Sequence, residues 1–254
     1  MKAMVRRIAC ILGIVSLVAL QGAIGASLSD AFSFLERNPL FMEFMTAVKV
    51  EGSAVEAESL RLRIYAQDES EPEATITKIR VDTTLARLYV ETDTKSKERG
   101  ETLLREAEEK LSLLEKELPF HTLILGSEID GIWYLQNPRS LGKGMSSSRK
   151  IHKAFKEFPL EVSSLLLKAN SMLYAPSFAG GDVKGALNMF LAILKDADAL
   201  LSPWDRSSLY SGIGIACFKL KDYQNAKGYL AAAKAIYPYD AVLDEYIAQV
   251  EKML

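Results

Sequence analysis

The sequence has few of the residues from which disulfides and metal centres are built. It contains two cysteines and two histidines among 254 residues. Cys10 lies in a segment that we expect to be removed, so Cys217 has no partner for an intramolecular disulfide and the fold must be stabilised by packing. His121 and His152 have no second metal-type ligand at a known spacing. We therefore expect neither a metal ion nor a cofactor.

Long hydrophobic runs are also scarce. The run at residues 8–20 is too short to cross a bilayer core of about 30 Å as a helix. Three basic residues precede it and the small residues of GAIGAS follow, which predicts a secretory signal peptide over residues 1–26. Cys10 stands near the start of the run, whereas a bacterial lipoprotein needs its cysteine after the run. We expect an exported, periplasmic protein with no stable membrane span in its mature form. Secretion, or anchoring by an uncleaved signal, stays open.

Neither sign of charge is in excess. The 31 basic and 33 acidic residues give a formal net charge of −2, which argues against nucleic acid as a partner. No Ser-His-Asp set and no pair of catalytic carboxylates can be argued from spacing. The acids between residues 106 and 117 are mixed with lysines, as on a solvated helix face. We therefore expect a protein without catalytic activity.

The sequence does contain a repeat, and its clearest unit is SSLYSGIGIACFKLKDYQNAKGYLAAAKAIYP, residues 207–238. With residue 207 as position 1, a bulky residue occupies position 4, small residues occupy positions 8, 20 and 27, and a proline ends the unit. These are Tyr210, Gly214, Ala226, Ala233 and Pro238. The spacing places the small residues on facing sides of two helices, which can then approach closely. The unit resembles the tetratricopeptide (TPR) repeat.

The resemblance implies an all-α fold, a right-handed α-solenoid of antiparallel helix pairs with capping helices at both ends. Weaker copies of the unit lie upstream, so we expect four TPR-like repeats at about 79–117, 118–159, 160–202 and 203–238. Residues 27–78 lack the repeat register and predict an N-terminal helical cap region or a degenerate helical pair. An exposed turn is expected at QDESEPEATI, residues 67–76. Residues 239–254 predict a C-terminal capping helix with Asp240 as its N-cap.

The interval between the facing small residues differs among the repeats. It is shortest in the fourth, from Gly214 to Ala226, and longest in the second, from Gly126 to Ser147, while the third is also lengthened. The difference predicts two long inter-helix loops, which in a solenoid emerge on one edge. The paired loops look like a pattern found in some exported bacterial TPR proteins.

The longest interval ends within SLGKGMSSSRKIHKAF, residues 140–155, which invites comparison with a phosphate-binding P-loop. That motif needs an earlier glycine where Asn137 stands, and Ser or Thr where Gly144 stands. The P-loop interpretation therefore fails. We expect a basic edge loop followed by a helix that begins near Ser146 to Ser148. It could bind an acidic partner segment, an anionic surface or a small anion, and a merely solvated helix face stays open. Its residues are Arg139, Lys143, Arg149, Lys150 and Lys153.

A TPR solenoid usually binds an extended segment of its partner along the concave face, at positions 2, 5, 9 and 12 of the first helices. The resemblance implies a mostly polar partner-binding groove, which suits an extended peptide better than an apolar ligand. Its residues are Arg80, Thr83, Arg87, Ser127, Asp130, Ser163, Asn170, Leu173, Ser208, Ser211 and Phe218.

We therefore expect an exported TPR-like adaptor, scaffold or assembly factor of the bacterial cell envelope that binds a protein partner of unknown identity. The alternative, a small-ligand or solute-binding accessory protein of an envelope transporter, stays open.

Overall fold

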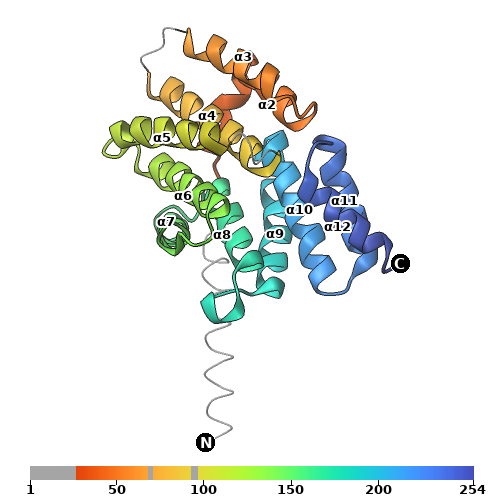
Figure 1. The fold of residues 1–254 in the computed structure, drawn as a ribbon. Helices are drawn as coiled ribbons and strands as arrows, with labels where there is room; N and C mark the ends of the chain where they lie inside the picture. Colours follow the sequence, from red (N-terminus) through yellow and green to blue (C-terminus); the bar gives the residue numbers. More distant parts are fainter. Residues whose placement is uncertain (1–26, 68–70, 93–96) are drawn as a thin grey trace, which may run out of the picture.

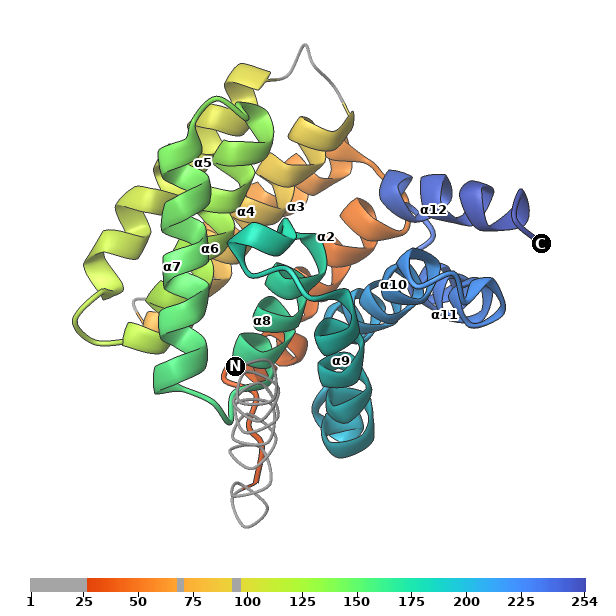
Figure 2. The same ribbon diagram turned by 90° about the horizontal axis from the view of Figure 1, so that it is seen from below.

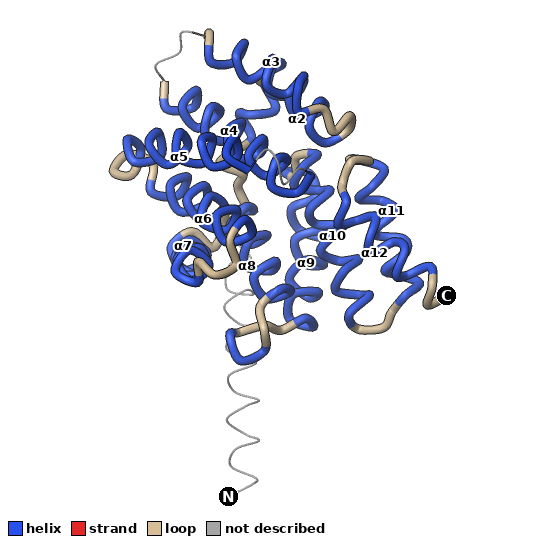
Figure 3. Tube along the Cα trace, viewed as in Figure 1, coloured by secondary structure: helices blue, strands red, loops and turns tan. Residues whose placement is uncertain are grey.

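The computed structural model describes residues 27–67, 71–92 and 97–254, and the predicted signal peptide lies outside these ranges. The described residues form eleven α-helices and short 3-10 turns, with no strand, so the expected all-α class is confirmed (Figure 3). No helix among them is both long enough and apolar enough to span a membrane.

Most of the helices form consecutive pairs that pack against each other (Figure 1). The first pair is α2 (Pro39–Lys49) with α3 (Ala54–Tyr65), preceded by the 3-10 turn η1 (Ser33–Arg37). It is followed by α4 (Pro72–Thr92) with α5 (Lys97–Leu114), α6 (Pro119–Gln136) with α7 (Leu141–Glu157), α8 (Val162–Tyr174) with α9 (Val183–Ala197), and α10 (Pro203–Lys219) with α11 (Tyr223–Ile236). The last helix is α12 (Ala241–Glu251), and the 3-10 turns η3 (Ser177–Ala179) and η4 (Asp198–Leu200) flank α9.

The turn expected at residues 67–76 is shorter than the sequence indicated. Helix α4 begins at Pro72, which is favourable at the first position of a helix. Ala74 and Ile76 are already buried in this helix, because its first turns pack against the preceding pair. The first helix of the first expected repeat therefore begins at Pro72 rather than near residue 79. Residues 27–78 supply the pair α2 and α3 before it.

Close approach of α10 and α11 depends on glycine. A β-carbon added at Gly214 would lie 2.7 Å from Leu230 Cγ and 3.1 Å from the Leu230 backbone nitrogen. The sequence pattern that placed small residues at this contact is therefore explained by packing. The expected N-cap of α12 is also present, because Asp240 accepts hydrogen bonds from the backbone N–H groups of Val242 and Leu243.

The buried hydrophobic residues form two cores that meet between α7 and α8. One core belongs mainly to η1 and α2–α7, and the other to α8–α12. The first helices of neighbouring pairs pack against each other in α2 with α4, α4 with α6, and α8 with α10, whereas α6 and α8 are not among the closely packed pairs. The N-terminal segment, residues 27–38, runs beside α8 (Figures 1 and 2).

Backbone and side-chain hydrogen bonds hold this segment in place. The Ser29 N–H donates to the Leu160 carbonyl at 3.0 Å, and the Val162 N–H donates to the Ser29 carbonyl at 2.9 Å. The Glu161 carboxylate accepts from the Ser29 hydroxyl at 2.8 Å and from the Ala31 N–H at 3.0 Å. The N-terminal segment therefore occupies part of the interior of the molecule.

The two ends of the chain also meet. Phe41 of α2 packs edge-on against Trp204 of α10, with ring centroids 5.6 Å apart. The Tyr239 N–H, just before α12, donates to the Lys49 carbonyl at the end of α2 at 3.0 Å. The row of helix pairs therefore curls until its last members touch its first.

Candidate functional site

The interior of the curled molecule collects charged groups from the first helices of four pairs and a tyrosine from the first helix of the fifth. Each of these groups either acts on the pKa of another or has its own pKa changed by one, which indicates that they surround one region. We call this region the inner face. It comprises Lys49 of α2, Arg80, Arg87 and Glu91 of α4, Glu128 of α6, Tyr174 of α8, Asp205 of α10, and Asp240 at the start of α12.

Arg80 is the most enclosed cation of the inner face. Its guanidinium pairs with Glu128 and lies 4.7 Å from the centre of the Phe32 ring. Burial lowers the pKa of Arg80, but the neighbouring Glu128 carboxylate raises it above the usual value, so the ion pair is retained. The Nε of Arg80 is buried and has no hydrogen-bond partner among the described residues.

Arg87, about two turns further along α4, is open to water. Its side chain is 51% exposed and donates to Glu91 at 2.6 Å. Tyr174, at the end of α8, is 53% exposed. Burial nevertheless raises the pKa of Tyr174 to about 12, and burial is the largest influence on the pKa of Arg87. The charge of Arg87 lowers the pKa of Tyr174 in part, so the two half-exposed side chains lie near each other although they come from different helix pairs.

Burial shows which of the predicted groove residues can reach a partner. Arg80 and Arg87 belong to the inner face, whereas five others are buried and cannot contact a partner in this conformation. These five are Thr83, Ser127, Asp130, Ser163 and Leu173. Of the remaining four, Asn170, Ser211 and Phe218 are partly exposed and Ser208 is exposed.

The reason for this correction is helical rotation. Each residue turns a helix by about 100°, so an error of one position moves a side chain from the inner face into a packed interface. Glu128 and Tyr174 directly follow the predicted Ser127 and Leu173, and it is they that belong to the inner face. In the second and third repeats, where the repeat pattern is weak, these two predicted groove positions therefore lie one residue before the residue that belongs to the inner face.

The prediction of a long basic edge loop between α6 and α7 is also wrong. The connection between α6 and α7 spans only residues 137–140, and the Gly-Lys-Gly and serine residues lie within α7, which begins at Leu141. The long spacing from Gly126 to Ser147 is taken up by longer helices. Only the α8–α9 connection, residues 175–182, is a long loop among the described connections, and Gly180 adopts a left-handed conformation there (φ 90°).

The basic residues of this segment divide into two kinds. Lys143 and Lys150 both bind the buried Asp130, and Lys150 also donates to the Gly126 carbonyl at 3.2 Å. Arg139, Arg149 and Lys153 are exposed, and no ion pair is formed by them with the described residues. The lysines nearest α6 therefore hold the helix pair together, and the exposed cations form a solvated face of α7 and its preceding turn.

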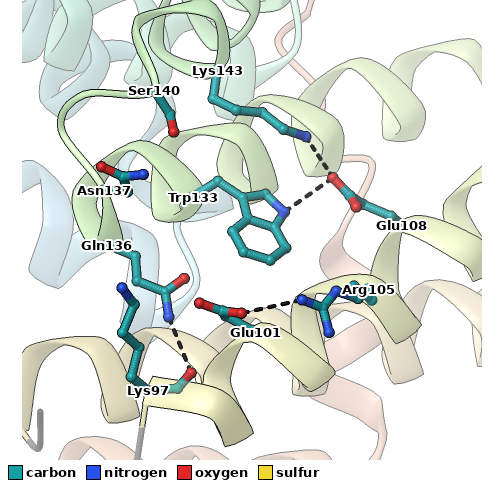
Figure 4. Close-up of a pocket in the computed structure, with 9 residues that line it drawn as sticks. All are labelled: Lys97, Glu101, Arg105, Glu108, Trp133, Gln136, Asn137, Ser140 and Lys143. Atoms are coloured by element: carbon teal, nitrogen blue, oxygen red, sulfur yellow. Dashed lines mark hydrogen bonds and ion pairs between the residues drawn. The ribbon is translucent and has the colours of Figure 1, made fainter.

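A cleft that the sequence did not indicate lies where α5, α6 and α7 meet. It has a volume of about 310 Å³ and nine lining residues, which Figure 4 labels. Trp133 lies in the middle of them, and its indole N–H donates to Glu108 at 3.1 Å. Lys143 donates to the same carboxylate oxygen at 2.7 Å, and Arg105 donates to Glu101 at 3.1 Å. No signal in the sequence distinguished this tryptophan from one that packs between helices.

No set of three His, Cys, Asp or Glu side chains within the described ranges is placed to hold a metal ion. No family model, curated protein or solved structure matches the chain.

Proposed function

We propose that this chain is an exported TPR-like adaptor or assembly factor, which binds a segment of a partner protein against the inner face and performs no catalysis. The single observation in favour is the pair Arg87 and Tyr174, which come from different helix pairs, are each about half exposed, and lie close enough for the Arg87 charge to act on the pKa of Tyr174. A rigid helical layer that presents wetted polar and aromatic side chains is suited to binding a peptide.

Helix pairing supports the TPR-like part of the proposal. The pairs from α4 to α11 fall in the four segments that resemble repeats, apart from the early start of α4. The clearest repeat also has the close helix contact that its glycine requires. The inner face draws on the first helix of each pair, as the concave layer of a TPR solenoid does.

The chain's own N-terminal segment supports the choice of a peptide as ligand. Ser29 forms a parallel bridge with Glu161 just before α8, and residues 29–31 are bound through their backbone and by the Glu161 carboxylate. A partner segment bound further along the interior would meet Arg87, which has one carboxylate partner, and the accessible ring of Tyr174. We propose that the partner supplies a carboxylate at Arg87 and an apolar or aromatic side chain at Tyr174.

The export part of the proposal has a separate test. Mass spectrometry of the protein purified from its natural source should find an N-terminus at Ala26 or Ser27 if the signal is cleaved as proposed. An intact N-terminus on protein recovered from the cytoplasm would contradict export without affecting the proposed binding role.

The adaptor role is tested by affinity capture from extracts of the source cells with matched variants. Arg87 and Arg63 are both about half exposed, and each pairs with one carboxylate. R87A should reduce recovery of a captured protein at least tenfold, while R63A, on the outer helix α3, should leave recovery unchanged. Equal recovery with both variants would contradict binding at the inner face, and a co-purified small molecule without any protein would favour the role of a small-ligand accessory protein.

A further inference from the structure

The cleft around Trp133 is a separate site from the inner face, and its size suits a small ligand. It opens between α5 and the α6–α7 hairpin, and its volume of about 310 Å³ is near the lower limit for pockets that bind small molecules. Such a volume fits a ligand of one or two rings and excludes a folded segment of another protein.

The side chains that line the cleft limit the class of ligand that it can bind. Trp133 is the only aromatic or aliphatic residue among the nine, so an apolar ligand would take water from the polar side chains of the lining without offering them hydrogen bonds. Two of the three cations are neutralised, because Lys143 is paired with Glu108 and Arg105 with Glu101, while no ion pair of Lys97 is formed with the described residues. A densely charged anion such as phosphate would have to break these pairs. The cleft therefore favours a neutral ligand with many hydrogen-bonding groups.

Hydrogen bonds hold the polar side chains of the cleft in position, and one of their acceptor atoms has no partner among the described residues. The Gln136 amide donates through Nε2 to the Lys97 carbonyl at 3.1 Å, which fixes its orientation. Its Oε1 is buried and has no hydrogen-bond partner among the described residues, and in Figure 4 it lies on the side of Trp133. A buried acceptor without a partner is unfavourable, and a ligand hydroxyl that reaches it after a small movement of the side chain would relieve that penalty.

The indole is bordered by two cations and not by packed rings. The Arg105 guanidinium and the Lys143 ammonium lie over the Trp133 ring, 6.0 and 5.9 Å from its centre. Both groups end flexible side chains, which can move aside for a ligand. No other aromatic ring within the described part of the chain stacks on Trp133. A ligand with a flat C–H surface can therefore pack on the indole, while its rim faces the polar groups.

We propose that this cleft binds a neutral sugar, a pyranose ring or a short oligosaccharide, through Trp133 and Gln136. A pyranose has C–H groups on its faces and hydroxyl groups around its edge, which matches one indole surrounded by polar side chains. The ring packs on Trp133, one hydroxyl donates to Gln136 Oε1, and others bind the free oxygen atoms of Glu101 and Glu108. This site does not depend on the adaptor role of the inner face.

The test is an NMR titration of the intact protein, observed at the indole N–H signals of its two tryptophans. Trp133→Phe assigns the two signals, and Trp204 of α10 serves as an internal control. Methyl glucoside, methyl galactoside and N-acetylglucosamine are added, with inorganic phosphate in a parallel titration. A ligand this small should saturate with a Kd of about 1 mM.

The proposal expects at least one sugar to shift the Trp133 signal saturably while the Trp204 signal stays in place. Gln136→Leu, checked by circular dichroism to be folded, should weaken this binding at least tenfold. Tighter binding of the corresponding disaccharides would identify a glycan chain as the source of the sugar, and equal binding would identify a free sugar. The proposal is overturned if no sugar gives a saturable shift, if phosphate gives the same shift, or if folded Gln136→Leu binds as well as the parent protein.

Discussion

Lys150 of α7 forms an ion pair with Asp130 of α6, whose side chain is only 5% exposed. Lys143 binds the other oxygen of the same carboxylate at 3.0 Å. Burial raises the pKa of Asp130, but hydrogen bonds from Lys150, Ser146 and Lys143 outweigh burial and bring it below the usual value. The charge in the middle of the α6–α7 pair is therefore kept and neutralised by the two lysines.

Replacing these lysines should destabilise the protein although both lie in a segment rich in exposed charge. K143Q/K150Q leaves the Asp130 carboxylate buried without a cation, which we expect to lower the free energy of unfolding by about 3–5 kcal/mol. Urea-induced unfolding, followed by circular dichroism, measures the change.

R149Q/K153Q removes the same amount of charge from the exposed face of α7 and serves as the control. Its effect should stay within about 0.5 kcal/mol, because exposed charges contribute little to stability. Equal losses in the two double variants would show that the Asp130 cluster has no special role.

The close contact of α10 and α11 can be tested with two glycines of the same repeat. G214A should destabilise the protein by about 1–3 kcal/mol, because the new β-carbon would lie 2.7 Å from Leu230 Cγ. G228A adds the same methyl group on the exposed side of α11, where nothing lies within 4 Å. It should stabilise the helix by about 0.5–1 kcal/mol. Thermal unfolding measures both variants, and the melting temperature should fall for G214A and rise for G228A. Melting temperatures that move in the same direction would contradict this packing.

A buried ion network joins α3, α4 and α5. Arg61 donates through Nε to Asp82 at 2.7 Å, Lys110 donates to the same carboxylate at 3.2 Å, and Asp82 is fully buried. R61A should lower the free energy of unfolding by about 3–5 kcal/mol, because it leaves part of this carboxylate unpaired. R63A, two residues away in the exposed pair with Glu43, should lower it by less than about 1 kcal/mol. Denaturant unfolding measures both variants. Equal losses of unfolding free energy in R61A and R63A would show that the buried ion pair of Arg61 contributes no more than an exposed one.

The inner face predicts a pH dependence of stability that centres on Asp205. Burial raises the pKa of this carboxyl from 3.8 to about 7, although the Ser202 hydroxyl donates to it at 2.6 Å and lowers the pKa in part. Between about pH 4 and pH 7 the folded chain keeps a proton here that the unfolded chain has released. The contribution of Asp205 to the free energy of unfolding therefore falls as pH rises through this window and is constant above it.

Asp205→Asn removes the titrating group and keeps an oxygen that can accept from Ser202. Relative to the parent protein, the variant should gain about 2–4 kcal/mol of stability between pH 4 and pH 8. Denaturant unfolding at several pH values measures the difference, with Asp196→Asn on α9 as a control for net charge. A difference between variant and parent that does not change with pH would contradict a protonated Asp205 in the folded state.

The sequence predicted the helical class and the close approach of α10 and α11 at Gly214, because these follow from local spacing. The small residue at position 214 and Asp240 as an N-cap depend on residues close in the chain, although the side chain that Gly214 meets, Leu230, was not predicted. The α7 boundary was wrong because glycines and serines are unfavourable in helices, whereas packing on α6 and the bonds from Lys143 and Lys150 to Asp130 override that preference.

The candidate sites depend on contacts between distant residues, which spacing does not reveal. The inner face needs the curl that brings Tyr239 to Lys49, and the cleft needs Trp133 to meet Glu108 of another helix pair. In the weak repeats, one position of register decided whether Ser127 or Glu128 was assigned to the inner face. Without a strong repeat pattern in α6 and α8, the sequence could not fix that rotation.

Site-specific photo-crosslinking tests the central claim, that a partner protein binds at the inner face, most directly. A photoreactive phenylalanine analogue is placed at Tyr174 on the inner face or at Leu113 on the outer helix α5, where the side chains are 53% and 76% exposed. The protein is irradiated in extracts of the source cells. The account predicts a discrete crosslinked species from position 174 that R87A abolishes, and none from position 113. Crosslinks from position 113 alone, or the same products from both positions, would contradict it.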